Sequence, residues 1–333
     1  MPTAIGSMPH TEPEEACSIV MKYLPAIPAW PQLPKRSPKE NMSIQFSEGF
    51  PGIVIARDKI HIEPWANFES ELGQIYADCE EDNPSKYGVS VEYAAGFHAF
   101  LSKVKRTEIV KGQITGPITW GLTVTDQDNQ AILYDQTLAE IAAKFLRLKA
   151  SWQENTLRQI SLNPIIFVDE PYLVSLGSVF TPIPEDKVAA LLEEVFQGIK
   201  GIKGLHCCGN TDWPVLLGTT TDILSFDAYN YASSLSSYPN EVKSFLQRGG
   251  TIAWGIVPND EEALAKESLS SLRDRLEEAM APFTQNGISF KQILRQGLLT
   301  PSCGLAALSP EAACQALELL AKLSHDLRRR YTL

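Results

Sequence analysis

Short apolar runs alternate with longer amphipathic stretches along most of the chain. Apolar runs that read as strands lie at residues 108–115, 165–169, 205–208, 222–227, 251–257 and 298–303. Between and after them, apolar residues recur at helical spacing in residues 134–160, 184–199, 213–217, 238–247 and 260–280, and in a closing helix that starts at Pro310. Regular alternation of strands and helices predicts an α/β fold with a parallel sheet.

The N-terminal third continues the pattern less regularly. Residues 2–7 and 26–33 are predicted strands, with a helix between them and another at residues 89–104. Five prolines between Pro25 and Pro38 keep the flanks of the second strand extended. The count is then eight strand–helix units, which predicts a single (β/α)8 TIM barrel spanning residues 1–333.

Residues 34–88 interrupt the barrel pattern after the second strand. Turn signals surround one predicted hairpin at residues 53–62. Because long irregular segments in compact domains are usually functional, we expect this insertion to form a lid or a docking surface.

Composition narrows the classes of function. The net charge of −11 argues against a nucleic-acid partner, which would require clustered Lys and Arg. The start of the chain has no secretory h-region, and no apolar run reaches the ~20 residues of a membrane span. We therefore expect a cytoplasmic protein, in which the six cysteines bind metal or do chemistry rather than form a disulfide framework.

Polar residues with chemical potential follow the predicted strands. Active sites of such barrels lie at the C-terminal ends of the strands. The residues found there are Ser7, Asp169, His206, Cys208, Asp227 and Cys303.

The stretch His206-Cys207-Cys208 predicts half of a zinc site. Successive side chains on a strand point to opposite faces, so His206 and Cys208 share one face and Cys207 points to the other. Zinc binds histidine nitrogen and cysteine sulfur, and Cys303 at the end of another strand can supply a third ligand. The alternative is that these cysteines are ordinary core residues.

Several motifs resemble the catalytic barrel of cobalamin-independent methionine synthases. They are Ile5-Gly6-Ser7-Met8-Pro9-His10-Thr11, Val110-Lys111-Gly112-Gln113-Ile114-Thr115-Gly116-Pro117, Val168-Asp169-Glu170-Pro171, His206-Cys207-Cys208 and Pro301-Ser302-Cys303-Gly304-Leu305. The run from His206 to Thr211 is also similar to corrinoid-dependent methyltransferases that methylate coenzyme M. Both families share a barrel superfamily with uroporphyrinogen decarboxylase.

The resemblance implies a role for each matching residue. Zinc would be held by His206, Cys208 and Cys303, with Asp227 where the synthases have a glutamate ligand. Asp169 matches the aspartate that holds the amino group of homocysteine, and Ser7 matches the serine near its carboxylate. The implied activity is methyl transfer to a zinc-bound thiol, with homocysteine converted to methionine.

Departures from the family pattern bear on the methyl donor. The synthases have a histidine after the seventh strand, associated with protonating the folate leaving group, where this chain has residues 254–259, Trp-Gly-Ile-Val-Pro-Asn. A counterpart of their His-Gly-Glu stretch and of their additional N-terminal barrel is not found in this sequence. Because a corrinoid leaves without a proton, a methylated corrinoid such as methylcobalamin, free or on a corrinoid protein, is the expected donor. If folate serves instead, His10 is the candidate acid.

Two rival functions remain open. One is a metal-free, uroporphyrinogen decarboxylase-like enzyme, for which Lys35-Arg36 would have to bind the carboxylates of the substrate. The other is a non-catalytic zinc-binding partner of a corrinoid protein. Asp126 and Asp128 suggest a hard-metal site only weakly, and we expect them to lie in a solvated loop.

Overall fold

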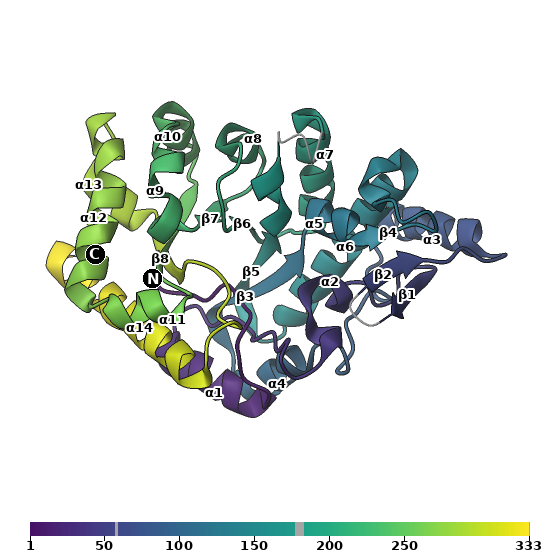
Figure 1. Ribbon diagram of the computed structural model, residues 1–333, viewed down its shortest axis with the longest axis horizontal. Helices are drawn as coiled ribbons and strands as arrows, with labels where there is room; N and C mark the ends of the chain where they lie inside the picture. The colour runs from purple at the N-terminus through teal and green to yellow at the C-terminus, as the bar shows by residue number, and fades with distance from the viewer. Residues whose placement is uncertain (57–58, 177–182, 333) are drawn as a thin grey trace.

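A curled parallel sheet forms the centre of the molecule (Figure 1). The computed structural model describes residues 1–56, 59–176 and 183–332. The strand order of the sheet follows the chain, β3-β5-β6-β7-β8-β9. The strands are β3 (Thr107–Thr115), β5 (Ser161–Asp169), β6 (Ile202–Cys207), β7 (Ile223–Phe226), β8 (Thr251–Val257) and β9 (Gly297–Pro301).

The two faces of the sheet bury different sets of side chains. Ile165, Phe167, Ile223, Ala253 and Leu298 belong to a small apolar cluster on the concave face. The alternate residues of the same strands belong to the main core, beneath the surrounding helices. This alternation follows from the two-residue period of a strand, and it fixes which residues near the strand ends face inward.

Six strands make the parallel sheet of the described residues, so the predicted closed barrel of eight strands is wrong in this respect. Two extended N-terminal segments cross the gap between β9 and β3 through isolated bridges, Pro2 with Leu299 and Ala29 with Lys111. A third bridge, Ser7 with Gln32, joins the two segments. Proline has no N–H for a ladder, and the prolines in these segments explain why the expected strands are reduced to single bridges.

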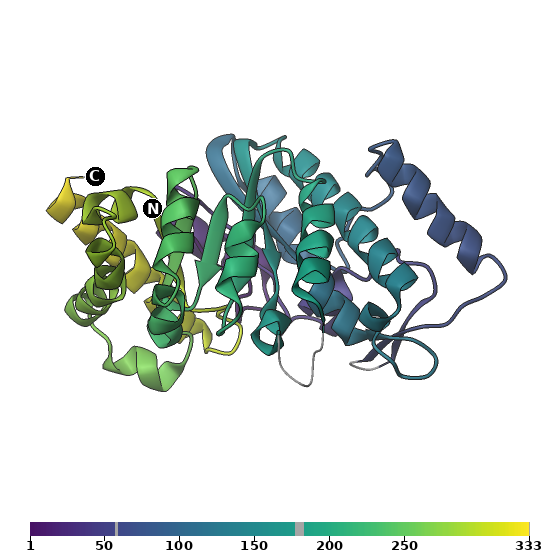
Figure 2. The ribbon, with the colours of Figure 1, turned by 90° about the horizontal axis from the view of Figure 1, so that it is seen from above.

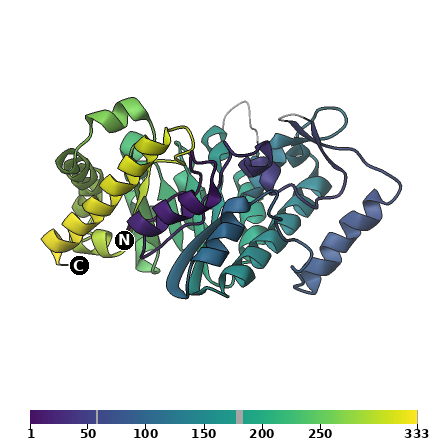
Figure 3. The same cartoon turned by 90° about the horizontal axis from the view of Figure 1, so that it is seen from below.

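Helices cover the convex face of the sheet, and α1 and α14 lie side by side along one side of it (Figure 3). The α-helices are α1 (Pro13–Tyr23), α2 (Met42–Gln45), α3 (Phe68–Glu80), α4 (Ala95–Lys103), α5 (Pro117–Thr123), α6 (Gln136–Leu157), α7 (Glu185–Phe196), α8 (Trp213–Gly218), α9 (Ala228–Ser236), α10 (Pro239–Gln247), α11 (Glu261–Lys266), α12 (Leu269–Gln285), α13 (Phe290–Arg295) and α14 (Pro310–Tyr331). The predicted helix at residues 260–280 is two helices, α11 and α12. None of the helices in the described ranges is long and apolar enough to cross a membrane.

The insertion at residues 34–88 has more structure than the sequence predicts. Strands β1 (Ile53–Ala56) and β2 (Lys59–Ile62) form the predicted antiparallel hairpin, and residues 57–58 between them lie outside the described residues. β2 also pairs with β4 (Val124–Thr125). The unpredicted helix α3 lies at one end of the molecule (Figure 2) and packs on α6. A lid or docking role for this insertion stays a prediction.

Candidate active site

Strand β6 directs His206 and Cys208 toward the concave side of the sheet. Its Gly204 lies so close to Phe167 of β5 that a Cβ atom would come within 2.5 Å of the ring. Cys207 belongs to the main core on the opposite face, where its thiol lies 3.7 Å from the Gly209 carbonyl oxygen. The predicted division of the three residues between two faces is confirmed.

Cys303 completes a three-residue group with His206 and Cys208. It follows β9, where Ser302 holds the turn: its amide donates to the Val257 carbonyl at 2.8 Å and its hydroxyl donates to Asn259 at 2.9 Å. One ligand atom from each of His206, Cys208 and Cys303 lies within 4.8 Å of the other two. The sequence thus predicted which side chains meet, although they come from strands at different places in the sheet.

The imidazole of His206 is arranged to offer one nitrogen to a ligand. Its Nδ1 lies 3.0 Å from the Ser225 hydroxyl of β7, which fixes the ring orientation. Its Nε2 is buried and has no hydrogen-bond partner in the described part of the chain. A buried imidazole nitrogen without a partner, facing two thiols, fits a soft divalent metal such as zinc.

The two thiols share their charge unequally. The neighbouring Cys303 thiol, together with His206, lowers the pKa of Cys208 against the opposing effect of burial. The same contact, together with burial, raises the pKa of Cys303. One thiolate is therefore already favoured at neutral pH, and thiolates are the form in which cysteine binds metal.

Asp169 lies at the end of β5 beside this group, as the sequence predicts. Its side chain is buried, and its Oδ1 has no hydrogen-bond partner among the described residues. Burial raises the pKa of Asp169 to about 6, opposed by the positive charges of Lys111 and His206. A buried carboxylate oxygen without a donor is suited to receive a cationic group of a ligand.

Lys111 is a buried residue near the site, and the sequence analysis gave it no role. It lies on β3, where its Nζ donates to the Ile5 carbonyl oxygen at 2.5 Å and to Gln113 Oε1 at 3.2 Å. Burial lowers the pKa of Lys111 to about 8, and Asp169 opposes that shift. Lys111 and Gln113 lie two positions apart on a buried strand, so their side chains point to the same face. This spacing in the sequence could have indicated that polar side chains face inward.

Glu170 anchors the turn that carries Asp169 and was also missed. Its carboxylate accepts hydrogen bonds from the backbone amides of Ile118 (2.8 Å) and Thr119 (2.7 Å) in α5. Its own amide donates to the His206 carbonyl oxygen at 2.8 Å. Glu170 thereby ties the turn after Asp169 both to α5 and to the strand of His206.

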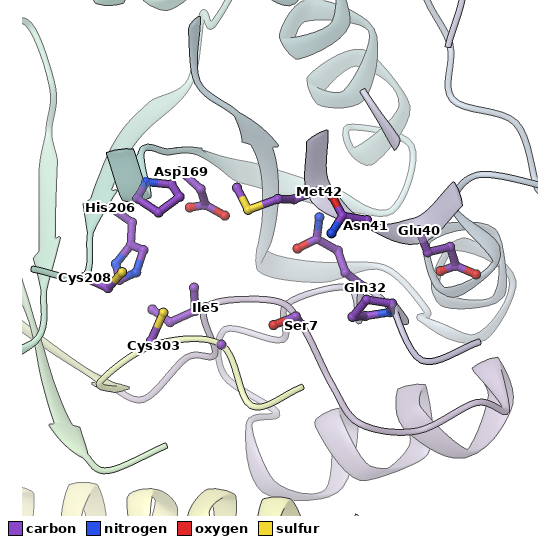
Figure 4. A pocket seen from close by; sticks show the side chains of 13 residues that line it. Ile5, Ser7, Gln32, Glu40, Asn41, Met42, Asp169, His206, Cys208 and Cys303 are labelled. Carbon is purple, nitrogen blue, oxygen red and sulfur yellow. The ribbon is translucent and has the colours of Figure 1, made fainter. Parts of the chain in front are cut away.

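A cavity of about 240 Å³ opens beside the thiols (Figure 4). His206, Cys208, Cys303 and Asp169 lie at one end, and Ser7 and residues of the early insertion lie toward the other. The remaining lining residues are Ile5, Gln32, Pro34, Glu40, Asn41, Met42, Pro171 and Gly304. Gln32 was missed although it lies in a predicted strand, and Glu40, Asn41 and Met42 were missed because their segment has no periodicity that would place it.

Asp227 and His10, two further predicted site residues, do not line the cavity. The group formed by His206, Cys208 and Cys303 does not include Asp227. Asp227 is the N-cap of α9, and its two carboxylate oxygens accept from the backbone amide (2.8 Å) and side-chain amide (2.7 Å) of Asn230. His10 is buried and does not line the cavity; burial lowers its pKa, opposed by Glu15 and Glu311.

Residues invoked for rival sites are engaged in local contacts. Lys35 donates to the Leu308 carbonyl oxygen at 2.8 Å, and Arg36 pairs with Glu40 at 2.9 Å. Asp126 Oδ1 accepts from the backbone amides of Asp128 and Gln130, as in a loop closed by its own aspartate.

Solved structures of methyltransferases share this fold. A B12-independent methionine synthase from Shewanella sp. W3-18-1, in complex with selenomethionine, matches over 99% of this chain and 98% of its own (TM-score 0.53, 14% identity). A candidate vitamin B12-independent methionine synthase from Listeria monocytogenes matches over 95% of this chain and 86% of its own (TM-score 0.59, 16% identity). A methyltransferase from Methanosarcina mazei matches over 98% and 93% (TM-score 0.58, 12% identity).

Neither a protein-family model nor a curated protein matches the sequence. The similarity is therefore one of fold, with identities of 12–16% in the three structures. What the site does has to be argued from its own residues.

Proposed function

We propose that this protein is a zinc-dependent methyltransferase that methylates the thiol of homocysteine, with a methylated corrinoid as the donor. The observation that carries the proposal is the convergence of the His206 Nε2 atom and the two thiols at one end of a cavity with a buried carboxylate. The selenomethionine in the Shewanella enzyme, a molecule of the shape expected for the product, supports it.

Each residue has a role in this proposal. His206, Cys208 and Cys303 would hold zinc, which when bound keeps an acceptor thiol deprotonated at neutral pH. Three protein ligands are typical of catalytic zinc sites, which keep a position open for substrate. Asp169 would hold the ammonium group of homocysteine, and the Ser7 hydroxyl lies along the same cavity for its carboxylate.

The proposed donor follows from proton balance. Transfer from a methylcorrinoid breaks the carbon–cobalt bond, with the electron pair left on cobalt, and forms the carbon–sulfur bond from the sulfur lone pair. Transfer from methyltetrahydrofolate leaves an amine that must be protonated. Residues 254–259 contain no histidine, and His10 lies outside the cavity lining, so neither supplies that proton.

Incubation of the zinc-loaded protein with homocysteine and either donor tests the proposal. Methionine should form with methylcobalamin and not with methyltetrahydrofolate. Efficient turnover with folate would contradict the assigned donor. Absence of methionine with both donors would contradict the enzyme and favour a zinc-binding partner of a corrinoid protein.

A further inference from the structure

The described residues that line the cavity include acidic side chains but no lysine or arginine. The acidic side chains are the buried carboxylates of Asp169 and Glu40. Lys111 lies close by, but it does not line the cavity, and its Nζ donates to Ile5 and Gln113. Arg36 pairs with Glu40 and is likewise absent from the lining.

The amide of Gln32 has its orientation imposed by a relay of hydrogen bonds. A backbone carbonyl can only accept, so the bond of 2.6 Å from Gln45 to the Tyr93 carbonyl oxygen must come from Gln45 Nε2. Gln45 Oε1 then faces Gln32 and accepts from Gln32 Nε2 at 2.8 Å. The remaining atom, Gln32 Oε1, is turned the other way.

Gln32 Oε1 is consequently an acceptor presented to the cavity. Figure 4 shows the oxygen end of its amide on the side of the cavity where Asp169 lies. No hydrogen bond among the described residues ends on this oxygen, and Asp169 Oδ1 is also without a donor. Gly6, with a φ of 152°, makes room for the amide, because a Cβ there would lie 3.0 Å from Gln32 Oε1 and 2.7 Å from Gln113 Nε2.

We infer that Gln32 is a specificity-determining residue that accepts a hydrogen bond from the ammonium group of the thiol substrate, so that the site takes primary aminothiols as a class, whether or not they carry a carboxylate. The inference rests on the proposed function, because it presumes a thiol acceptor. An ammonium has three donors, and the oxygens of Asp169 and Gln32 that lack donors are both acceptors in the lining of the same cavity. With His206 assigned to zinc, a substrate carboxylate would meet neutral donors in the lining, such as the Ser7 hydroxyl.

Two analogues of homocysteine, each lacking one of its two charged groups, test this inference on the unsubstituted protein. 3-Aminopropane-1-thiol keeps the amine and lacks the carboxylate, and 4-sulfanylbutanoate keeps the carboxylate and lacks the amine. Titration calorimetry of the zinc-loaded protein should show the aminothiol binding roughly tenfold or more tighter than the carboxylate thiol. Equal binding, or the reverse order, would overturn the inference.

Substitution at the relay provides the second arm. Gln32→Leu should reduce the preference for the aminothiol by roughly tenfold, and Gln45→Leu, which frees the Gln32 amide to turn, should reduce it as well. Gln127→Leu, the same change at an exposed loop position, is the matched control. Preference unchanged in folded Gln32→Leu protein would overturn the role of Gln32.

The outcomes separate this inference from the proposed function. Homocysteine that binds and is methylated while the two analogues bind alike defeats only the inference. Homocysteine that neither binds nor is methylated defeats the proposed function, and the inference with it.

Discussion

At the scale of single residues, the site is built around charges that the fold keeps away from water. Asp169 and Lys111 are both buried, and each opposes the effect of burial on the pKa of the other. A buried charge is costly unless it is paired, so these two side chains depend on each other. The Oδ1 atom of Asp169 has no hydrogen-bond donor among the described residues, so it can accept from a group of a ligand.

Replacement of Asp169 by asparagine tests whether its charge holds the ammonium group of homocysteine. Asp169→Asn keeps the size of the side chain and removes its charge, so the affinity for homocysteine should fall by roughly 10- to 100-fold. Zinc content should stay normal, because the three proposed ligands are untouched. Calorimetry and elemental analysis measure the two quantities, with Asp128→Asn in the exposed loop as the matched control. Unchanged affinity would contradict the role given to Asp169.

Residue-level prediction succeeded where a side chain follows from strand geometry. The inward direction of His206 and Cys208 could be read from the two-residue period, and Cys303 from its place after a strand. The positions of Gln32 and Glu40 could not, because they depend on how the proline-rich segment after residue 25 crosses the gap between β9 and β3. Asp227 is where the sequence placed it, at a strand end, but its oxygens are used to cap α9.

At the scale of elements, α6 joins the insertion to the barrel through a buried lysine. The Nζ of Lys149 lies 3.5 Å from the Tyr87 carbonyl oxygen and 3.4 Å from that of Gly88, and 4.8 Å from the centre of the Phe145 ring. Burial lowers the pKa of Lys149 to about 7, and Glu48 opposes the shift. The amine is therefore close to half neutral at pH 7 in the folded state.

This depressed pKa predicts a pH dependence of stability. Between about pH 7 and 10 the unfolded chain binds a proton at Lys149 that the folded chain has largely lost, so the free energy of unfolding should rise with pH. The contribution is at most about 1.4 kcal/mol per pH unit, and it levels off below pH 7. Denaturant unfolding at several pH values should show a rise that is smaller in Lys149→Met by this contribution, because Lys111 adds a rise of its own. Parallel curves for the two proteins would contradict the assignment.

The N-terminal segments show why element prediction failed near the barrel closure. Their apolar runs are those of strands, but the prolines at positions 2, 28 and 31 leave ladder donors missing. Only single bridges form, and hydrogen bonds such as Thr3 to Leu299 (2.9 Å) and Lys111 to Pro28 (2.9 Å) carry the closure. Inside the insertion, α3 was missed although Phe68, Leu72, Ile75 and Cys79 recur at helical spacing, which was the available signal.

At the scale of the whole molecule, the same N-terminal segments join the two edges of the sheet and line the site. The segments that bridge β9 and β3 also carry Ser7 and Gln32 into the cavity, so the same segments span the gap in the sheet and complete the site. The sequence predicted the class of the fold, which is α/β with a parallel sheet, and it predicted that the candidate site residues lie at the ends of strands. The shared fold with solved methyltransferases at 12–16% identity fits that account.

Zinc content of cysteine variants tests the central claim most directly. The purified protein should contain about one zinc per chain, as in mononuclear sites of this ligand type. Cys208→Ala and Cys303→Ala should each lose most of it, whereas Cys207→Ala, whose thiol faces the core, and Asp227→Ala, whose carboxylate caps α9, should retain it. Equal loss from all three cysteine variants, or no zinc in the unsubstituted protein, would contradict the account.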